Sequence, residues 1–450
     1  MREMKDSGIA WIGKIPRKWK IKKIKNIICN DKEGIKIGPF GSALANKTMT
    51  DGPYNIYGQA NLVNDDFSYT KNTINKSTFH TLKSYQVLPN DICLSMMGTI
   101  GKCKTVPIGI KAGIMDSHLI KIRLDKTQIL NKFFEYVYDK DLSDICITEM
   151  QYVKKGSIMD GLNTSIVKNL RIIIPSVLEQ QAIADYLDAK CADIDSLTAD
   201  IQKQINILKE YKKSVITQAV TKGLDPDVEM KDSGIEWIGM IPSKWNIGKI
   251  KSYVDKVGSG KTPKGDNTLY TKGKILFLRS QNVYNTGIIL DDPPTVITDA
   301  IDKELSNTRV ITDDVLLNIT GGSIGRCCIY NLEKKANVNQ HVSIIRMKKD
   351  KMLSGYMHYF WISDLGQTAI NLYQTGGNRE GMSASAIKNT PIPFMPIWEQ
   401  QAIIDFLDSK CADIDAIISG KQKQLDVLKE YKKSLIYEYV TGKKEVPCRE

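Results

Sequence analysis

The stretch VGSGKTP at residues 257–263 has the residue types of a phosphate-binding loop, in which glycine amides and a lysine hold the phosphates of a nucleotide. The full pattern needs a glycine five residues before Gly260, and that position holds Asp255. Pro263 would also disturb the helix that must follow such a loop. We therefore expect no nucleotide to bind at this segment.

The segment IILDDPPTV at residues 288–296 could carry a different chemistry. A strand that ends in Asp-Pro-Pro and an aromatic residue is typical of DNA amino-methyltransferases, and Asp292-Pro293-Pro294 resembles its first three positions. The fourth residue is Thr295, which has no ring to stack on an extruded adenine. The chain also lacks a glycine-rich cofactor loop after a strand. A proline-rich turn is the simpler interpretation, and methyl transfer by this segment stays as the alternative function.

Two glycine-rich turns occupy equivalent places, GTIGK at residues 98–102 and GGSIGR at 321–326. Each is either only a tight turn or a turn that presents a cation, Lys102 or Arg326, to phosphate. The nine cysteines include no CxxC pair and the four histidines do not cluster, which favours buried free thiols over a metal site. No carboxylate pair or nucleophile set stands out, so the sequence indicates a binding protein without chemistry of its own.

The chain contains an internal duplication. MKDSGIAWIGKIPRKW at residues 4–19 returns as MKDSGIEWIGMIPSKW at 230–245, with three of sixteen positions changed. Two further pairs of segments repeat: EQQAIADYLDAKCADID (179–195) as EQQAIIDFLDSKCADID (399–415), and KEYKKSVI (209–216) as KEYKKSLI (429–436). The stretches between them have diverged, although VLPNDICLSMMGTIGKC (87–103) still resembles VITDDVLLNITGGSIGRCC (310–328). We expect two copies of one fold with different surfaces.

The repeated segments that begin at Glu179 and Glu399 predict two long helices. Residues 179–220 contain no proline or glycine, and Gly223 and Pro226 end the helix. In the first helix, apolar residues recur every seven positions at Leu187, Ile194, Ile201, Leu208 and Val215, and we expect Leu197, Ile205 and Tyr211 on the same side. The second helix carries Leu407, Ile414, Ile417, Leu425, Leu428 and Leu435. We expect an antiparallel coiled coil, with a softer point at Gly420 in the second helix. Each helix could instead pack only on its own domain.

The variable stretches predict strands with polar loops. ILFLRSQNV, VLLNITGG, HVSIIRM and NLRIIIP are rich in β-branched residues, and NKFFEYVYDKDL predicts a short helix. At 450 residues the chain is long enough for two domains. A net charge of +12 favours an anionic polymer as partner. Without a bilayer-length apolar run or a signal peptide, we expect a cytoplasmic location.

Several motifs occur in an order that resembles one known family over essentially the whole chain. DSGIEWIGMIPSKW precedes a variable domain, GPFGSAL (38–44) and SGKTP (259–263) lie near the two domain starts, EQQAIADYLD and EQQAIIDFLD open the helices, and TKGLDP joins the halves. Together they resemble the specificity subunit of a Type I DNA restriction-modification enzyme. The resemblance implies a non-catalytic subunit that binds a split DNA sequence, with one target-recognition domain for each half-site.

The same resemblance implies the fold and the partners. The fold class is α+β, with two β-rich target-recognition domains separated by two long helices that form an antiparallel coiled coil and set the spacing of the half-sites. Two methyltransferase subunits that carry S-adenosylmethionine would dock on the duplicated frame, and a motor-nuclease subunit that uses ATP and Mg could join them. No cofactor is expected in this chain. Trp11, Trp19, Trp237 and Trp245 are expected to be packing anchors of the frame.

The expected domain division follows the repeats. Its parts are the first recognition domain (1–178), the central spacer helix (179–222), a linker (223–229), the second recognition domain (230–398), the C-terminal spacer helix (399–442) and a tail (443–450). Because the family offers no universal base-contact code, the candidate DNA contacts rest on side-chain chemistry and loop placement. They are Lys36, Ser42, Gln59, Asn61, Lys102, Lys154, Lys155, Lys261, Lys264, Arg279, Gln281, Asn282, Arg326, Asn378 and Arg379.

Two other function classes remain open. A self-contained adenine methyltransferase would bind S-adenosylmethionine itself and would lose activity on Asp292→Ala. A coiled-coil scaffold without a DNA role would show no salt-sensitive DNA affinity, although the divergence of the paired domains argues against it.

Overall fold

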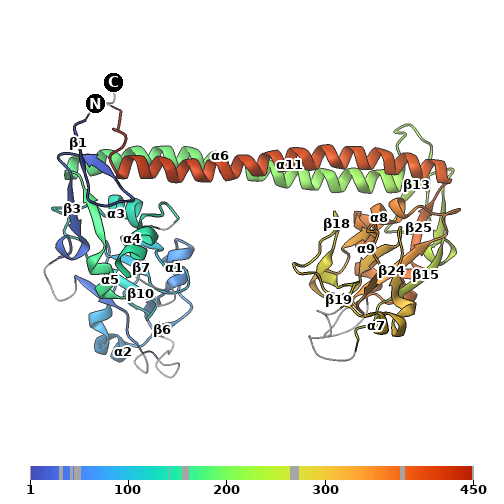
Figure 1. Ribbon diagram of the computed structural model, residues 1–450, viewed down its shortest axis with the longest axis horizontal. Helices are drawn as coiled ribbons and strands as arrows, with labels where there is room; N and C mark the ends of the chain where they lie inside the picture. The colour runs from blue at the N-terminus through green and yellow to red at the C-terminus, as the bar shows by residue number, and fades with distance from the viewer. Residues whose placement is uncertain are drawn as a thin grey trace. The chain divides into compact units, whose positions relative to one another are not determined.

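The chain forms two compact units, and the boundary between them falls inside its two long helices. A computed structural model describes residues 2–29, 34–40, 44, 52–139, 141–154, 162–263, 273–374 and 381–447. Unit 1 contains Met1–Ile201 and Lys423–Glu450, and unit 2 contains Gln202–Gln422. The helices expected at 179–222 and 399–442 are α6 (Val177–Lys222) and α11 (Ile397–Val440) (Figure 1). In the part of the chain described, no helix has the length and apolarity needed to span a bilayer.

Unit 1 has two main sheets flanked by short helices. One sheet has the order β4-β10-β7-β8 and the other the order β6-β5-β9. Their strands are β4 (Ile35–Ile37), β5 (Tyr54–Tyr57), β6 (Thr73–Ile74), β7 (Ile92–Ser95), β8 (Cys103–Thr105), β9 (Gly113–Met115) and β10 (Leu119–Ile122). Two-stranded pairs join β1 (Met4–Asp6) to β2 (Lys14–Pro16) and β3 (Lys20–Lys23) to β11 (Arg171–Ile174). The helices are α1 (Gln59–Val63), α2 (Lys76–Thr81), α3 (Asn131–Tyr138), α4 (Ile145–Lys154) and α5 (Thr164–Asn169).

Unit 2 repeats this plan. Its sheets have the orders β15-β24-β21-β22 and β19-β16-β23-β20, and the hairpin β17-β18 is added. These strands are β15 (Val254–Ser259), β16 (Ile275–Leu278), β17 (Val283–Tyr284), β18 (Gly287–Ile288), β19 (Val296–Ile297), β20 (Arg309–Val310), β21 (Val315–Asn318), β22 (Cys327–Ile329), β23 (Ala336–Val338) and β24 (Val342–Met347). The pairs β12 (Met230–Asp232) with β13 (Met240–Pro242) and β14 (Asn246–Lys249) with β25 (Pro391–Phe394) match those of unit 1. Its helices are α7 (Asp299–Glu304), α8 (Ser354–Ile362), α9 (Asp364–Tyr373) and α10 (Ala384–Asn389). The predicted α+β class with an internal repeat is confirmed.

The helices α6 and α11 run antiparallel within each unit and bury one seam between them (Figure 1). The seam of α6 advances by alternate steps of four and three residues, so that each heptad supplies two inward positions. These positions are Leu187, Cys191, Ile194, Thr198, Ile201, Ile205, Leu208, Lys212 and Val215, all buried or half-buried. The equivalent positions of α11 follow the same steps from Leu407 to Tyr439. Helix α11 continues unbroken through Gly420.

The seam prediction is wrong for three residues. Leu197, Tyr211 and Ile417 are about half exposed. Each follows a seam residue by three positions, whereas the observed seam uses the position four residues on, so their side chains lie outside the helix pair. The correction leaves a set of apolar side chains on the outer surface of both long helices.

Equivalent contacts fix each long helix to its unit. The buried indole of Trp19 donates to Glu179 at 2.9 Å, and that of Trp245 donates to Glu399 at 2.8 Å. Gln180 in unit 1 and Gln400 in unit 2 make equivalent contacts. Each side chain accepts a hydrogen bond from one backbone amide and donates to two backbone carbonyls. Trp19 and Trp245 therefore anchor the frame.

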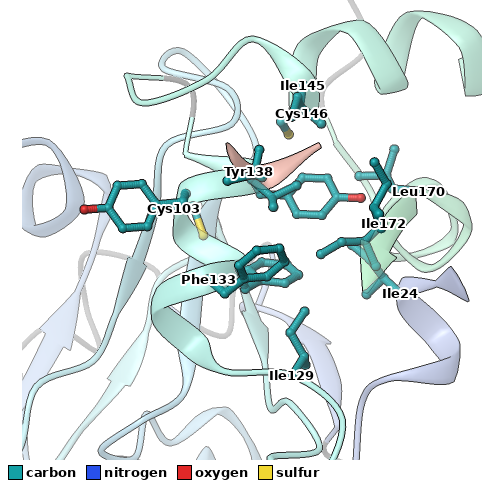
Figure 2. Close-up of a cluster of buried hydrophobic side chains, with 14 of the residues drawn as sticks. Ile24, Cys103, Ile129, Phe133, Tyr138, Ile145, Cys146, Leu170 and Ile172 are labelled. Carbon is teal, nitrogen blue, oxygen red and sulfur yellow. The ribbon is translucent and has the colours of Figure 1, made fainter. Parts of the chain in front are cut away.

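The core of unit 1 packs α3 and α4 against the strands. Figure 2 shows Phe133 and Tyr138 of α3 among the side chains of Ile24, Leu170 and Ile172. Cys103 and Cys146 lie in the same core, and burial raises the pKa of the Cys146 thiol to about 12. A thiol of that pKa stays protonated at neutral pH and is no nucleophile.

Candidate nucleic-acid interface and docking surfaces

One polar turn recurs on the same pair of strands in both units. In unit 1 it joins β9 to β10 and carries Asp116 and His118; in unit 2 it joins β23 to β24 and carries Asn339 and His341. The Asp116 carboxylate accepts from the His118 backbone amide at 2.8 Å, and the Asn339 side chain accepts from the His341 amide at 3.1 Å. The backbone turn is therefore alike in the two units, and the chemistry that it presents differs.

In unit 1 this turn borders a hollow of about 490 Å³. Its lining mixes acceptors and donors: Leu44, Ile56, Gly58, Gln59, Ala60, Asn61, Asn64, Asp66, Tyr69, Thr70, Lys71, Asn72, Asp116, Ser117 and His118. Burial raises the pKa of Asp116, and the hydrogen bonds from His118 oppose that rise only in part. Gln59, a predicted site residue, lies here with its amide hydrogen-bonded to Thr99. The hollow could accept a group that donates hydrogen bonds to a carboxylate and an amide.

In unit 2 the corresponding turn is part of a hydrogen-bonded cluster. The hydroxyl of Thr320 lies 2.5 Å from Nδ1 of His341, and Nε2 of the same ring lies 3.2 Å from the amide of Gln340. Gln340 also contacts the hydroxyl of Thr262, next to the predicted residue Lys261. Gln340 and Lys261 are exposed. This cluster offers amide and imidazole groups in place of the carboxylate of unit 1.

Asn61 and Asn282, both predicted DNA contacts, are buried. Asn61 Oδ1 accepts from the Gly58 amide at 2.9 Å, and Asn282 Oδ1 accepts from the Arg279 amide at 2.9 Å. Their side-chain amides donate inward to backbone carbonyls at 2.8–2.9 Å. Because these groups already have partners inside the protein, we assign the two asparagines to holding their loops in shape.

The two equivalent cations that follow the glycine-rich turns differ. Lys102 is buried and ion-paired, with Nζ 2.5 Å from Asp141 and 3.5 Å from Asp139. Arg326 is partly exposed, and its guanidinium lies 4.8 Å from the ring centre of Tyr284. A cation held by two carboxylates is poorly placed to bind phosphate, so of the two only Arg326 remains a candidate phosphate contact.

Three predicted residues lie near internal partners. Arg279 donates to Asp291 and Thr295 at 3.0 Å, and Gln281 donates to Asp291 at 3.0 Å. Lys36 of β4 places its Nζ 4.5 Å from the ring centre of Tyr85. Gln281 is exposed, and Arg279 and Lys36 are partly exposed, so they stay predictions.

The remaining predicted residues cannot be placed. Ser42, Lys155, Lys264, Asn378 and Arg379 lie outside the described residues. Lys154 ends α4, and its side chain also lies outside the described part. Residue chemistry alone missed Asp116, His118, Gln340 and His341. Aligning the two copies would have found them, because a histidine follows the equivalent strands in both.

A second surface repeats on the outer side of the long helices. Leu197, Ile207 and Tyr211 of α6 are exposed, and so are the residues 220 positions later, Ile417, Val427 and Tyr431 of α11. At the helix starts Leu178 and Trp398, again an equivalent pair, are 86% and 71% exposed. Each unit therefore carries the same set of exposed apolar positions.

Comparison with known proteins agrees with the duplication. The sequence model described as the Type I restriction modification DNA specificity domain matches residues 16–207 and 242–427. The chain is 27% identical to the Type I restriction enzyme MjaVIII specificity subunit of Methanocaldococcus jannaschii, over 81% of each chain. It is 24% identical to the Type I restriction enzyme EcoBI specificity subunit of Escherichia coli, over 76% of this chain and 72% of that one.

A solved structure shows the same fold. A chain from a structure of complex assembly and conformational transition of the type I R-M system superposes with a TM-score of 0.68 at 13% identity. The match covers 96% of this chain and 99% of that one.

Proposed function

Because the chain belongs to the family of Type I restriction modification DNA specificity domains, and carries that domain twice, we propose that it binds a split DNA sequence with one unit for each half-site. One observation carries the proposal. The turn of Asp116 and His118 in unit 1 has a counterpart in unit 2, the turn of Asn339 and His341. Each turn contains an equivalent hydrogen bond from the histidine backbone amide, but the two turns present different chemical groups to a ligand.

The two half-sites should be unlike. Unit 1 presents a carboxylate at a hollow, and carboxylates accept from the exocyclic amines of cytosine or adenine. Unit 2 presents Gln340 and His341 on a surface cluster, and amides can pair with adenine edges. A frame that repeats its contacts closely while these groups differ fits recognition of an asymmetric target.

We further propose that two identical methyltransferase subunits dock on the long helices. The apolar positions outside the seam come in equivalent pairs, such as Leu178 with Trp398 and Tyr211 with Tyr431. Two matching surfaces suit two copies of one partner. S-adenosylmethionine would belong to these subunits, and ATP with Mg to a motor-nuclease subunit that joins them.

The chain itself would perform no catalysis. The alternative, methyl transfer at Asp292-Pro293-Pro294, requires a strand that leads into this segment and an open parallel sheet with a cofactor site. The strand before this segment is the two-residue β18, which pairs with β17 in a hairpin, and the described sheets of unit 2 are antiparallel except for the pair β16 and β23. Arg279 binds Asp291 and Thr295, which supports a bracing role for this turn.

The test is base-resolution mapping of N6-methyladenine in DNA from cells that coexpress this chain with its methyltransferase subunit. The expected result is a two-part motif with a fixed gap. Replacing residues 30–170 with the recognition domain of a relative should change one half of the motif and leave the other intact. A change in both halves, or methylation that does not depend on this chain, contradicts the proposal.

A further inference from the structure

Unit 2 contains a basic hollow of about 500 Å³ that the recognition turn does not use. It lies where the second half of α6 meets the turn of the hairpin β17-β18, the glycine-rich turn before β22, and α8 and α9. Its polar lining includes Lys209, Lys212, Lys213, Asn285, Thr286 and Arg326. Among the residues that the structure describes, four cations and no carboxylate line the hollow.

Two of these cations are already neutralised. Lys212 contacts Asp415 at 2.7 Å, and Lys213 pairs with Asp364. Lys209 and Arg326 form no ion pair with any carboxylate among the described residues. The guanidinium of Arg326 lies over the ring of Tyr284, 4.8 Å from its centre, and a cation–π contact of this kind does not use the hydrogen-bonding capacity of the N–H groups. The hollow therefore retains an excess of positive charge.

Neutral groups in the hollow add hydrogen-bond donors. The carbonyl oxygen of the Asn285 side chain accepts from the Cys327 amide at 3.0 Å, which leaves its NH₂ group as the available end. Thr286 adds a hydroxyl beside it. Cations with amide and hydroxyl donors, and no acidic acceptor, suit a phosphate group rather than a base edge.

The described residues of unit 1 do not repeat this arrangement. Lys102, the counterpart of Arg326, is held by Asp139 and Asp141. Among the described residues of unit 1, no hairpin corresponds to β17-β18. The excess charge at this place is thus a property of unit 2 and not of the shared frame.

We propose that this hollow binds the phosphate backbone of duplex DNA, as a sequence-independent contact that only unit 2 makes. The inference rests on the proposed function, since it needs DNA on this face of unit 2. The uncompensated positive charge of the hollow attracts a polyanion, and duplex DNA is the polyanion that the proposed function brings to unit 2. The contact would strengthen binding without selecting bases.

The experiment measures DNA affinity of the complex with its methyltransferase subunits over a series of salt concentrations. The double variant Lys209→Gln with Arg326→Gln should bind target and unrelated duplexes about tenfold more weakly near 0.1 M salt, by a similar factor for each. The slope of log affinity against log salt should fall by about 2, or about 0.9 for each lost phosphate contact. Lys209→Gln with Arg326→Lys should recover about half of that slope, because it keeps the second charge.

The matched control is Lys429→Gln, the equivalent of Lys209 in unit 1, which should leave affinity and slope unchanged. An unchanged slope in the double variant, while the wild-type complex binds its target, overturns the inference and leaves the proposed function standing. Loss of methyltransferase subunits on size-exclusion chromatography would assign the hollow to a protein partner and also overturn it. A wild-type complex without target-dependent binding would overturn both proposals.

Discussion

The ammonium group of Lys432 on α11 lies 2.6 Å from Oδ1 and 2.8 Å from Oδ2 of Asp195 on α6. The same contact recurs in unit 2 with the helices exchanged, where Lys212 of α6 contacts Asp415 of α11 at 2.7 and 2.8 Å. The residues that follow form equivalent bonds too, Lys433 with Asp144 and Lys213 with Asp364. In each unit, the two lysines of the repeated segment KEYKKS therefore form ion pairs with different partners. The first binds the other long helix, and the second binds the globular part of the same unit.

Reversing one charge of the first pair should weaken the helix pair of unit 1. Asp195→Lys places two cations together and should lower the free energy of unfolding by about 1 kcal/mol, the upper range for an exposed pair. The double variant Asp195→Lys with Lys432→Asp should recover most of the loss. Urea unfolding of the four species gives the coupling energy between the two substitutions, for which we expect about 1–2 kcal/mol.

The control for that cycle is Asp200→Lys, an exposed position of α6 whose carboxylate is absent from the ion pairs of the described residues. It should change stability by less than about 0.5 kcal/mol. Additive effects of Asp195→Lys and Lys432→Asp would show that the contact does not join the helices.

The indole of Trp245 should contribute more than any single exposed ion pair. Trp245→Phe keeps most of the apolar surface and removes the donor to Glu399, leaving a partly buried carboxylate without that bond. We expect the free energy of unfolding to fall by about 1–3 kcal/mol. Glu399→Gln keeps an acceptor oxygen, so in denaturant titrations it should cost less than Trp245→Phe. An equal loss in both variants would mean that charge, not the indole bond, stabilises this contact.

Asp116→Asn should alter one half of the DNA target only. The backbone turn should survive, since the Asn339 side chain accepts the same backbone bond in unit 2. An amide both donates and accepts, whereas a carboxylate only accepts, so discrimination at one base pair should change by about 1–3 kcal/mol. Methylation mapping would show relaxed sequence at one position of the half-site assigned to unit 1. A change in the other half, or none in either, contradicts the role of Asp116.

Equivalent positions of α3 and α8 predict opposite responses to pH. Burial lowers the pKa of His358 to about 4 from its ordinary 6.5, while burial raises the pKa of Glu135, its counterpart in unit 1. Below pH 6.5 the unfolded chain binds a proton at His358 that the folded chain does not. The free energy of unfolding therefore keeps the full contribution of neutral His358 above about pH 6.5 and loses it as the pH falls toward 4.

His358→Gln should remove that pH dependence. The difference in unfolding free energy between wild type and variant should shift by up to about 3 kcal/mol between pH 7 and pH 4. Glu135→Gln should give the opposite sign, because a folded state with a raised carboxyl pKa gains stability as pH falls toward 4.5. Chemical unfolding at several pH values tests both, and parallel curves for His358→Gln and wild type would contradict the prediction.

The duplication made the long helices and their repeated contacts predictable, because nearly identical segments fold alike. The heptad spacing of apolar residues and the residues that end a helix also indicated where the long helices lie. The phase of the seam was not predictable from Leu197 and Tyr211, since apolar residues occur both three and four positions after seam residues. Only packing selects Thr198 and Lys212 for the seam. The half-buried Lys212 occupies a seam position, and a pattern of apolar residues does not predict a lysine there.

The candidate DNA contacts stay predictions, because residue type alone does not show which polar side chains are already bonded inside the protein. Whether a polar side chain can bind a ligand depends on whether a residue distant in the sequence already forms a hydrogen bond or ion pair with it. Lys102 is neutralised by Asp141, 39 residues on, whereas its counterpart Arg326 has no ion pair with the carboxylates that the structure describes. Asn282 carries the residue type of a base contact, but its amide donates to Ile289. Residue chemistry names groups that can bind DNA, and only the fold shows which of them are already used.

Lengthening both long helices by one heptad should change the gap in the target and not its half-sites. Seven residues added after Gln202 in α6 and after Gln422 in α11 keep the four-and-three seam in register. They add about 10 Å of helix, equivalent to about three base pairs. Methylation mapping should then return the same two half-sites with the gap longer by about three. As a control, two added residues in each helix match neither step of the seam and should abolish a unique motif. An unchanged gap with the seven-residue insertion would show that the helices do not set the spacing.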